Sequence, residues 1–421
     1  MNKRVLLIAF HFPPQAASSG IQRTLSFSKY LGAFGWEPMV LTAHPRAYSQ
    51  QNSSQLASIP ADVVVRRAFA LDAKHHLGYK GRYLAFTALP DRWTSWLLGA
   101  IPAGLSLIRR YKPQVIWSTF PISTAHLIGL ALHRITGLPW VADFRDPMMQ
   151  PSYPVIPMQR RMYRWIERQA VVRCTTAVFT TQGAMEDYCR RFPQVSPTKF
   201  RVIENGYDED IFDAQPAATV PARAAGAAWR LTLLHSGVLY QDGRDPTPFL
   251  QALAHLKAGG RVSPDSLRVV LRAPGDLDGT RARVAAADVA DLVEVAPPIP
   301  YSEAVSEMLE ADGLMVFQGT PFNTQIPAKL YEYFRARKPI IGLLDPAGET
   351  ARVLDTAGCN DIAHIDSPDA IAAALERFLD CIAKGRATVA NEEVTRAASR
   401  RNRARELADV LDAAVQGARQ A

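Results

Sequence analysis

The feature that most constrains the fold is the regular alternation of short β-branched runs with longer segments of helical period. Such alternation is typical of parallel sheets that are covered by helices on both faces. The runs fall into two series, so we predict an α/β fold with two similar Rossmann-like units. The expected strands lie at residues 5–10, 38–41, 63–67, 115–119, 140–144, 177–181 and 201–204, and then at 231–235, 267–271, 314–317, 339–343 and 361–365.

Length and composition agree with more than one domain. A chain of 421 residues with 48% hydrophobic residues is long enough for two or three domains and too apolar to be disordered throughout. Residues 214–228 are rich in Ala and Pro and lack an apolar period, which favours a linker between a domain at 1–213 and another at 229–388. Residues 389–421 include a long helix candidate at 391–415, whose packing back on the first domain is left open.

Positive charge is concentrated in the first half of the chain. The formal charge is +8, made up of 25 − 14 = +11 over residues 1–215 and 23 − 26 = −3 over residues 216–421. Basic and aromatic residues that gather there attract anionic lipid headgroups or polyanions, although several of the aromatics are equally suited to a core. No nucleic-acid motif accompanies them, so an anionic membrane surface is the preferred partner over nucleic acid. The residues are Tyr79, Lys80, Arg82, Tyr83, Phe86, Arg92, Trp93, Trp96, Arg109, Arg110, Arg160, Arg161, Tyr163, Arg164 and Trp165.

The four cysteines, Cys174, Cys189, Cys359 and Cys381, are scattered without metal-binding spacing. They predict neither a metal site nor a disulfide framework, and a reducing cytosol fits them best. The apolar run at 5–10 is shorter than a signal peptide requires. We therefore expect a cytoplasmic protein, with a peripheral position at the inner face of the plasma membrane left open.

The first loop of the chain is a candidate anion site. Ser18, Ser19 and Gly20 lie where a loop meets a helix that begins near Ile21, and free amides at a helix N-terminus bind anions. Gly20 would let the backbone approach a phosphate closely. The alternative is that a serine caps the helix and Gly20 makes a turn, and this motif alone favours that alternative.

The segment PWVADFRDP places three charges at the end of an expected buried strand. Asp143, Arg145 and Asp146 would lie at the carboxyl edge of the sheet, where open α/β sheets bind ligands. The structural alternative is that Arg145 forms an ion-pair bracket between the two carboxylates. The sequence leaves these two interpretations open.

The segment IPAKLYEYFRARKP predicts a helix with Pro327 and Lys329 in its first turn and Glu332 further along. A lysine there opposes the helix dipole, unless the ammonium and the amides share a bound diphosphate. The alternative is a surface pair between Lys329 and Glu332, which stabilises a helix by only a few tenths of a kcal/mol.

The segment HSGVLYQDGRDP follows the first expected strand of the second series. It places Gly237 at the strand exit and Arg244 on the loop before a helix. Arg244 is able to clamp a phosphate through two nitrogens, and a solvated loop arginine is an equal alternative.

Together these motifs resemble the GT-B glycosyltransferases of the family 4 type that make bacterial surface polysaccharides or exopolysaccharides. The resemblance is carried, in the order of the family, by FHFPPQAASSGIQRTLSFSKYLGAFGWEPMVLT, PWVADFRDP, VIENGYDEDIF, HSGVLYQDGRDPTPFLQAL and IPAKLYEYFRARKPIIGLL. It implies two Rossmann-like domains that face a central cleft, with the acceptor bound mainly by the first and a nucleotide-diphosphate sugar mainly by the second. It also implies transfer with retention of anomeric configuration and no metal or other cofactor.

The resemblance also implies roles for individual residues. Glu332 matches the second Glu of the family's Glu, seven residues, Glu motif and would hold the donor ribose. Thr324 stands where the family has the first Glu, and Val238 follows Gly237 without the usual arginine. Arg244 and Lys329 are then the candidates for the missing charge.

These expectations define the candidate site. Asp143, Arg145 and Asp146 form its catalytic set, and Gly20, Gly237, Arg244, Lys329 and Glu332 form its donor-binding set. The chemistry needs positive groups to stabilise the leaving diphosphate. The expected function is sugar transfer to a saccharide or lipid-linked saccharide in polysaccharide biosynthesis. The alternatives are a nucleotide-sugar epimerase of the same architecture and an inactive GT-B scaffold.

Overall fold

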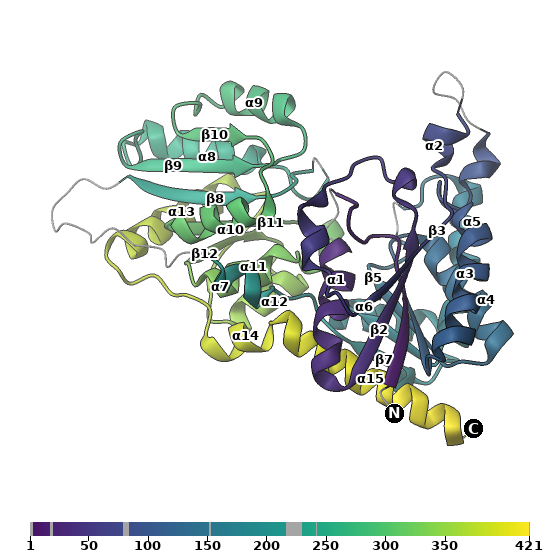
Figure 1. Cartoon of the computed structure of the whole chain (residues 1–421). Coiled ribbons are helices and arrows are strands. Elements are labelled where there is room, and N and C mark those ends of the chain that lie inside the picture. Colours follow the sequence, from purple (N-terminus) through teal and green to yellow (C-terminus); the bar gives the residue numbers. More distant parts are fainter. Residues whose placement is uncertain are drawn as a thin grey trace. The chain divides into compact units, whose positions relative to one another are not determined.

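The chain forms two compact units in the computed structural model, which describes residues 3–16, 20–78, 84–150, 153–215, 230–240 and 242–420. Unit 1 consists of Met1–Asn205 and Arg400–Ala421, and unit 2 consists of Gly206–Ser399. The chain therefore passes from one unit to the other at two places (Figure 1). Of the linker expected at 214–228, all but the first two residues lie outside the described part of the chain.

Unit 1 is built on a seven-stranded parallel sheet in the order β3-β2-β1-β4-β5-β6-β7. The strand order reverses between β1 and β4, and parallel sheets of this kind bind ligands outside the carboxyl ends of the strands at such a point. Its strands are β1 (Lys3–Ile8), β2 (Trp36–Ala43), β3 (Val64–Ala68), β4 (Val115–Thr119), β5 (Trp140–Arg145), β6 (Thr176–Phe179) and β7 (Phe200–Val202).

Two hydrophobic layers cover the two faces of this sheet. One contains Leu107, Ile128, Ile166 and Tyr188 from four successive helices. The other contains Leu25 and residues of the last helix of the chain. The helices of unit 1 are α1 (Gly20–Tyr30), α2 (Ala73–His76), α3 (Trp96–Tyr111), α4 (Ser123–Thr136), α5 (Pro157–Arg173), α6 (Gln182–Arg191) and α15 (Arg400–Gln420).

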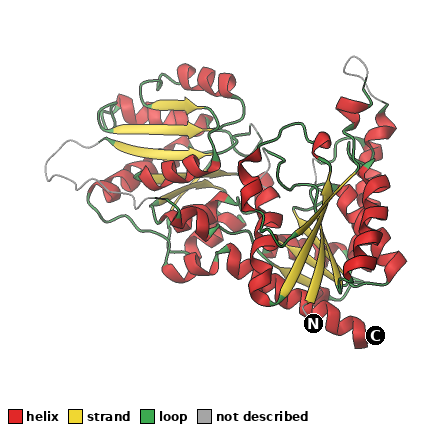
Figure 2. Ribbon diagram, viewed as in Figure 1, coloured by secondary structure: helices red, strands yellow, loops and turns green. Residues whose placement is uncertain are grey.

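Unit 2 repeats the plan with a six-stranded parallel sheet in the order β10-β9-β8-β11-β12-β13. Here the order reverses between β8 and β11. Figure 2 shows the strands of each unit lying between layers of helices. The strands of unit 2 are β8 (Leu231–Ser236), β9 (Leu267–Arg272), β10 (Val293–Ala296), β11 (Gly313–Gln318), β12 (Ile340–Leu344) and β13 (Asp361–His364).

The helices of unit 2 also divide between two hydrophobic layers. Leu253, Val284 and Leu375 fill one layer, and Leu330 and Leu354 belong to the other. None of the helices that the structure describes in either unit is long and apolar enough to cross a membrane. The helices of unit 2 are α7 (Glu209–Asp213), α8 (Thr247–Ala258), α9 (Leu277–Ala286), α10 (Tyr301–Glu310), α11 (Lys329–Ala336), α12 (Glu349–Thr356), α13 (Pro368–Ala383) and α14 (Glu392–Ala397).

The C-terminal segment differs from the single helix expected at 391–415. It forms α14 and α15, which are separated at Ala398 and Ser399. The carbonyl of Ala398 accepts a hydrogen bond from the amide of Tyr207 at 3.1 Å. The break lets the chain leave unit 2, and α15 then packs against α1 and buries Leu407 and Leu411 in unit 1.

Candidate active site

The polar edge of unit 1 is organised by one buried ion pair. Asp143, near the end of β5, is fully buried, and Arg23 reaches it from the first turn of α1. The Arg23 guanidinium donates to both carboxylate oxygens, at 2.7 and 3.0 Å. The Thr119 hydroxyl at the end of β4 donates to the same carboxylate at 2.7 Å. Asp143 is therefore fully engaged inside the protein and has a positioning role.

Arg23 uses its remaining donors to tie α1 to the end of the sheet. Two guanidinium nitrogens donate to the backbone carbonyls of Ile203 and Glu204, at 3.0 and 3.1 Å. A buried guanidinium that is paired and hydrogen-bonded in this way holds a rigid geometry. The sequence analysis did not select Arg23, although its place one turn after Gly20 was the available signal.

Arg145 has a different environment. Its backbone has φ 46°, a left-handed conformation that is strained for a residue with a side chain. The register of β5 against β6 shifts between Asp143 and Arg145, so the strand bulges there. The structural alternative, in which Arg145 bridges Asp143 and Asp146, does not match the structure, because Asp143 pairs with Arg23. Within the part of the chain that the structure describes, the Arg145 guanidinium has no hydrogen bond or ion pair, and its Nε is buried without a partner.

The charges around Arg145 explain its electrostatics. Burial lowers the pKa of Arg145, while the negative charge of Asp146 raises it. His11 follows β1, and burial together with the Arg145 charge lowers the pKa of His11 to about 3, so this imidazole is neutral. Among the expected site residues of unit 1, Arg145 and Asp146 therefore remain for contact with a ligand. Gly20 begins α1 and is buried, whereas Ser18 and Ser19 lie outside the described residues.

The polar edge of unit 2 centres on Lys329, which begins α11. Its ammonium donates to the carbonyl of Ser236 at the end of β8. Burial and the charge of the nearby Arg244 lower the pKa of Lys329 to about 7, against the opposite effect of Glu332. The lysine thus lies against the strand end at the point where the order of the sheet reverses.

Gly237 provides the space that Lys329 occupies. Its φ is 136°, and a Cβ built on it would collide with the lysine ammonium and lie 2.9 Å from Cε. The amide of Gly237 donates to the carbonyl of Arg272 at 2.8 Å, which fixes the loop against β9. The structure therefore brings together Gly237 and Lys329, two residues that the sequence analysis had selected separately.

Arg244 adds a second positive charge to this edge. Its guanidinium donates to the amide oxygen of Gln318 at 2.7 Å, and it stacks between the rings of Tyr240 and Phe322. These contacts hold the guanidinium of Arg244 at the edge of the sheet where Lys329 lies. Gln318 ends β11, and neither it nor the two rings was selected from the sequence.

Glu332 lies one turn after Lys329 and is buried. The hydroxyl of Tyr301, the first residue of α10, donates to its carboxylate at 2.5 Å. This contact orients the carboxylate. The alternative of a surface pair between Lys329 and Glu332 did not include Tyr301. Thr324 is exposed on the loop between β11 and α11.

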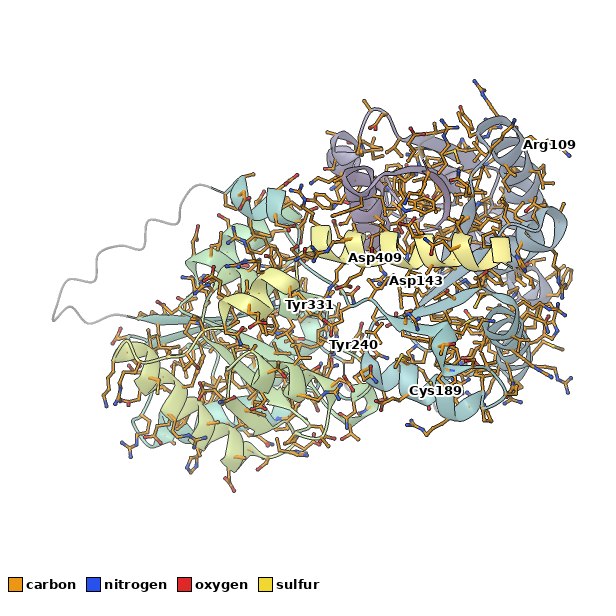
Figure 3. The ribbon with its side chains drawn as sticks, turned by 90° about the horizontal axis from the view of Figure 1, so that it is seen from below. Arg109, Asp143, Cys189, Tyr240, Tyr331 and Asp409 are labelled. Atoms are coloured by element: carbon orange, nitrogen blue, oxygen red, sulfur yellow. The ribbon has the colours of Figure 1, made fainter. Side chains whose placement is uncertain are left out.

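A buried histidine completes the end of β8. The Nδ1 of His235 lies 2.9 Å from the carbonyl oxygen of Met315, and Nε2 has no partner among the described residues. Burial, together with the charges of Lys329 and Arg244, holds its pKa well below the ordinary value. Figure 3 shows the side chains of each unit, with Asp143 labelled in unit 1 and Tyr240 labelled in unit 2.

Comparison with known proteins bears on the fold of the two units. The model of the glycosyl transferase 4-like domain matches residues 20–206, which run from α1 to the end of unit 1's first segment. No curated protein sequence matches the chain.

Solved structures match nearly the whole chain at low sequence identity. Sucrose-phosphate synthase from Thermosynechococcus elongatus is 16% identical with a TM-score of 0.61, over 99% of this chain and 98% of that one. Anabaena Alr3699/HepE in complex with UDP and glucose is 12% identical with a TM-score of 0.66, over 98% and 100%. UDP-GlcNAc 2-epimerase from Neisseria meningitidis bound to UDP-GlcNAc is 11% identical with a TM-score of 0.56, over 97% and 99%.

Two parallel-sheet units with these neighbours define the GT-B fold, as the sequence predicted. The first unit carries a glycosyl transferase 4-like domain, and the chain is a glycosyltransferase.

Proposed function

We propose that this glycosyltransferase moves a sugar from a nucleotide-diphosphate donor to a saccharide or lipid-linked saccharide in polysaccharide biosynthesis, with retention and without a metal ion. The donor binds to unit 2 and the acceptor to unit 1. The UDP bound in the Alr3699/HepE structure supports a nucleoside diphosphate as the ligand and makes UDP the first to test. We further propose a cytoplasmic enzyme at the inner face of the plasma membrane.

The observation that carries this proposal is the position of Lys329 against Gly237. Burial and the neighbouring charge of Arg244 disfavour the protonated ammonium of Lys329, and the charge of Glu332 offsets only part of this effect. A diphosphate at the end of β8 would satisfy both charges and accept from the amides that begin α11. Strain and misplaced charge of this kind are expected at a functional site.

The chemistry follows from these charges. When the bond between sugar and diphosphate breaks, negative charge grows on the leaving group, and Lys329 and Arg244 are placed to stabilise it. In our proposal the Glu332 carboxylate, oriented by Tyr301, accepts from the donor ribose. The leaving phosphate takes the proton of the acceptor hydroxyl, so no separate carboxylate base is required.

In unit 1 we assign Arg145 and Asp146 to the acceptor. Arg145 has a free guanidinium at the carboxyl end of β5, and Asp146 follows it. Asp143 holds Arg23 and so fixes the edge on which the acceptor lies.

Nucleotide binding tests the donor site directly. Wild-type protein is screened by thermal shift and titration calorimetry against UDP, GDP, ADP and TDP, since a selective ligand raises the melting temperature through its own binding energy. We expect Lys329→Ala and Glu332→Ala each to weaken binding of the selected nucleotide by about 100-fold, because a buried charged contact is lost. Arg281→Ala, which removes an exposed arginine of α9, is the matched control. Wild-type affinity in both site variants would refute the donor assignment.

Transfer assays then separate the alternatives. With the matching donor, transfer is expected to persist in EDTA and to give a product with the donor's anomeric configuration by NMR. The likeness to UDP-GlcNAc 2-epimerase favours epimerisation as the second function, which would isomerise the donor sugar without an acceptor. Failure to bind any of the nucleotides would instead indicate an inactive scaffold, which the threonine at position 324 favours.

A further inference from the structure

The outer helices of unit 1 carry charge of one sign. α3, α4 and α5 pack side by side, and their inner faces fill the same hydrophobic layer. Together their sequences contain eight arginines and one acidic residue, Glu167. Glu167 is buried, where Arg191 and the Tyr188 hydroxyl engage its carboxylate. The charged side chains on the outer surface of these three helices are therefore all positive.

The exposed face of α5 combines arginines with apolar side chains at helical spacing. We define the α5 stripe as Arg161, Arg164, Trp165 and Arg168, all of which are exposed. The three arginines have no hydrogen bond or ion pair with any residue for which the structure gives a position, and the Trp165 side chain is 51% exposed. Unpaired arginines on one helix face are unusual, because such groups generally find a carboxylate on a neighbouring turn.

An apolar surface lies at the end of these helices that is nearest the carboxyl edge of the sheet. We define the apolar cap as six exposed side chains at or before the start of α3 and α5. The Gln159 side chain donates to the carbonyl of Pro90 at 3.0 Å, which joins the segment before α3 to the first turn of α5. Leu98 is 75% exposed and Val155 is 82% exposed. The members of the cap are Leu84, Phe86, Leu98, Val155, Ile156 and Met158.

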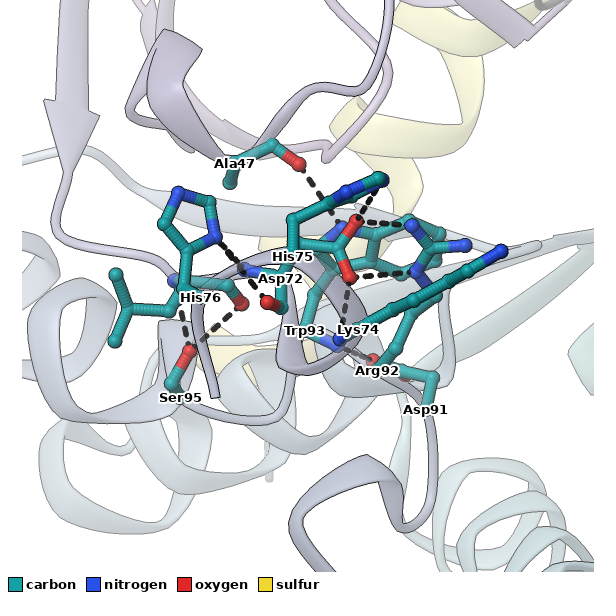
Figure 4. Close-up of polar contacts among 10 residues, drawn as sticks. Ala47, Asp72, Lys74, His75, His76, Asp91, Arg92, Trp93 and Ser95 are labelled. Atoms are coloured by element: carbon teal, nitrogen blue, oxygen red, sulfur yellow. Dashed lines mark hydrogen bonds and ion pairs between the residues drawn. The ribbon is translucent and has the colours of Figure 1, made fainter. Parts of the chain in front are cut away.

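Other residues of the basic and aromatic cluster expected from the sequence do not belong to this surface. Arg92 pairs with the buried Asp72 ahead of α2, as Figure 4 shows. Trp96 and Tyr163 are core residues. Tyr79, Lys80, Arg82 and Tyr83 lie outside the described residues.

We propose that the α5 stripe and the apolar cap dock unit 1 onto an anionic lipid bilayer. The arginines match the negative surface potential of the headgroups, and the cap residues enter the boundary between headgroups and acyl chains. Trp165 lies among the arginines of the α5 stripe, and an indole side chain favours the membrane interface.

The apolar cap distinguishes a bilayer from the other anionic partners. A nucleic acid would be held by arginines alone, because phosphate contacts supply nonspecific affinity, and it gains nothing from exposed aliphatic side chains. This inference does not depend on the donor assignment, because it rests on unit 1 alone.

The position of the cap has a consequence for the acceptor. The helices run antiparallel to the strands, so the starts of α3 and α5 lie at the same end of unit 1 as Arg145 and Asp146. A bilayer in contact with the cap would bring a lipid-linked saccharide to the edge of the sheet where we place the acceptor.

Vesicle co-sedimentation of the full chain tests the proposal. Wild-type protein is expected to bind vesicles of phosphatidylcholine mixed with phosphatidylglycerol and to leave pure phosphatidylcholine in solution. An arginine near an anionic surface strengthens binding about fivefold, so Arg161→Glu/Arg164→Glu/Arg168→Glu should reduce binding by at least about 100-fold. The control Arg261→Glu/Arg281→Glu/Arg352→Glu makes the same change in net charge on exposed residues of unit 2 and should bind as wild type.

Two further measurements make the outcome decisive. Trp165 emission is expected to move to shorter wavelength on anionic vesicles, and Trp165→Phe should lose this shift. Val155→Ser/Ile156→Ser should weaken vesicle binding and leave heparin binding unchanged. Equal loss in the unit 2 control, or binding of DNA and heparin without binding of anionic vesicles, would overturn the proposal. Nucleotide binding in all variants shows whether unit 2 remains folded and whether the donor site stands independently.

Discussion

The carboxyl edges of the two sheets handle charge in opposite ways. In unit 1 the most buried cation, Arg23, has its own carboxylate in Asp143, with two hydrogen bonds between them. In unit 2 the ammonium of Lys329 contacts a neutral carbonyl, and its charged neighbours are the cation Arg244 and the carboxylate of Glu332. The first six strands of unit 1 have the same order as the six strands of unit 2, and the seventh strand, β7, lies at the far edge of its sheet, so the difference lies in side chains and not in the backbone plan.

This contrast separates a structural charge from a charge kept for a ligand. A buried ion pair is stable in itself, whereas two neighbouring cations gain most from an anion supplied from outside. Unit 1 also contains Arg145, whose Nε is buried without a partner among the described residues. We assign this cation to ligand binding, in contrast to the paired Arg23 and Asp143. The difference between a charge that supports the fold and a charge that binds a ligand can therefore be tested by substituting single residues.

The largest effect is expected for Asp143→Asn. This change leaves the Arg23 guanidinium buried without a countercharge, which should lower the free energy of unfolding by about 3 to 5 kcal/mol. Urea denaturation followed by circular dichroism measures the loss. Arg23→Met/Asp143→Leu, which removes both charges, should recover most of it.

Asp146→Asn is the control for this prediction, because that carboxylate lies at the same strand end and is only partly buried. If Asp143→Asn is no less stable than Asp146→Asn, the pair in unit 1 is not the structural element that we describe.

The pH dependence of nucleotide binding should show an intermediate effect. The free protein has Lys329 with a pKa of about 7, and a bound diphosphate raises that pKa. Above pH 7 the free lysine loses its proton while the complex keeps it, so affinity should fall by up to about tenfold for each pH unit. Below pH 7 both forms are protonated and this group contributes no slope. Calorimetry from pH 6 to about pH 9 measures the change.

Lys329→Arg separates this lysine from the nucleotide's own ionisation. An arginine stays protonated throughout this range, so the fall in affinity attributed to Lys329 should disappear. A wild-type slope that survives in the variant would contradict the assignment.

The smallest effect is expected for Arg145→Gly. Glycine adopts the observed φ of 46° without strain, and the change also removes a charge that has no partner. The protein should gain about 1 kcal/mol of stability, seen as a melting temperature about 2 to 4 °C higher, and should lose transfer activity. Lys112→Gly, at φ 54° on the exposed end of α3, should give a similar backbone gain with full activity. A less stable Arg145→Gly protein would show that the guanidinium supports the fold.

Local patterns were enough to predict most of the sheet structure. Buried parallel strands are runs of apolar and β-branched residues, so twelve of the thirteen strands in the described part of the chain were anticipated. The exception, β10, has only four residues at the edge of its sheet and includes the exposed Glu294. The break at Ala398 and Ser399 was also missed, because the Ala- and Arg-rich sequence continues across it and the hydrogen bond from Tyr207 that marks it is not local.

The partners of the site residues could not be predicted in the same way. The spacing of the motifs predicted that Lys329, Gly237 and Arg244 lie at one edge of the sheet, since all three are close to the end of a strand or the start of a helix. It could not show that Asp143 pairs with Arg23, which is 120 residues away, or that Tyr301 orients Glu332. Such pairs depend on tertiary placement, for which a single sequence carries no local signal.

The return of α15 to unit 1 also bears on how the protein is made. Ala404, Leu407 and Leu411 fill the same hydrophobic layer as β1 and β4, and Lys3 pairs with Asp412 at 2.5 Å. On the ribosome, domains generally fold in the order in which they emerge. Here α1 covers only part of one face of the earliest strands, and the rest of that face must wait until residues 400–420 have left the exit tunnel, by which time the whole of unit 2 has been synthesised.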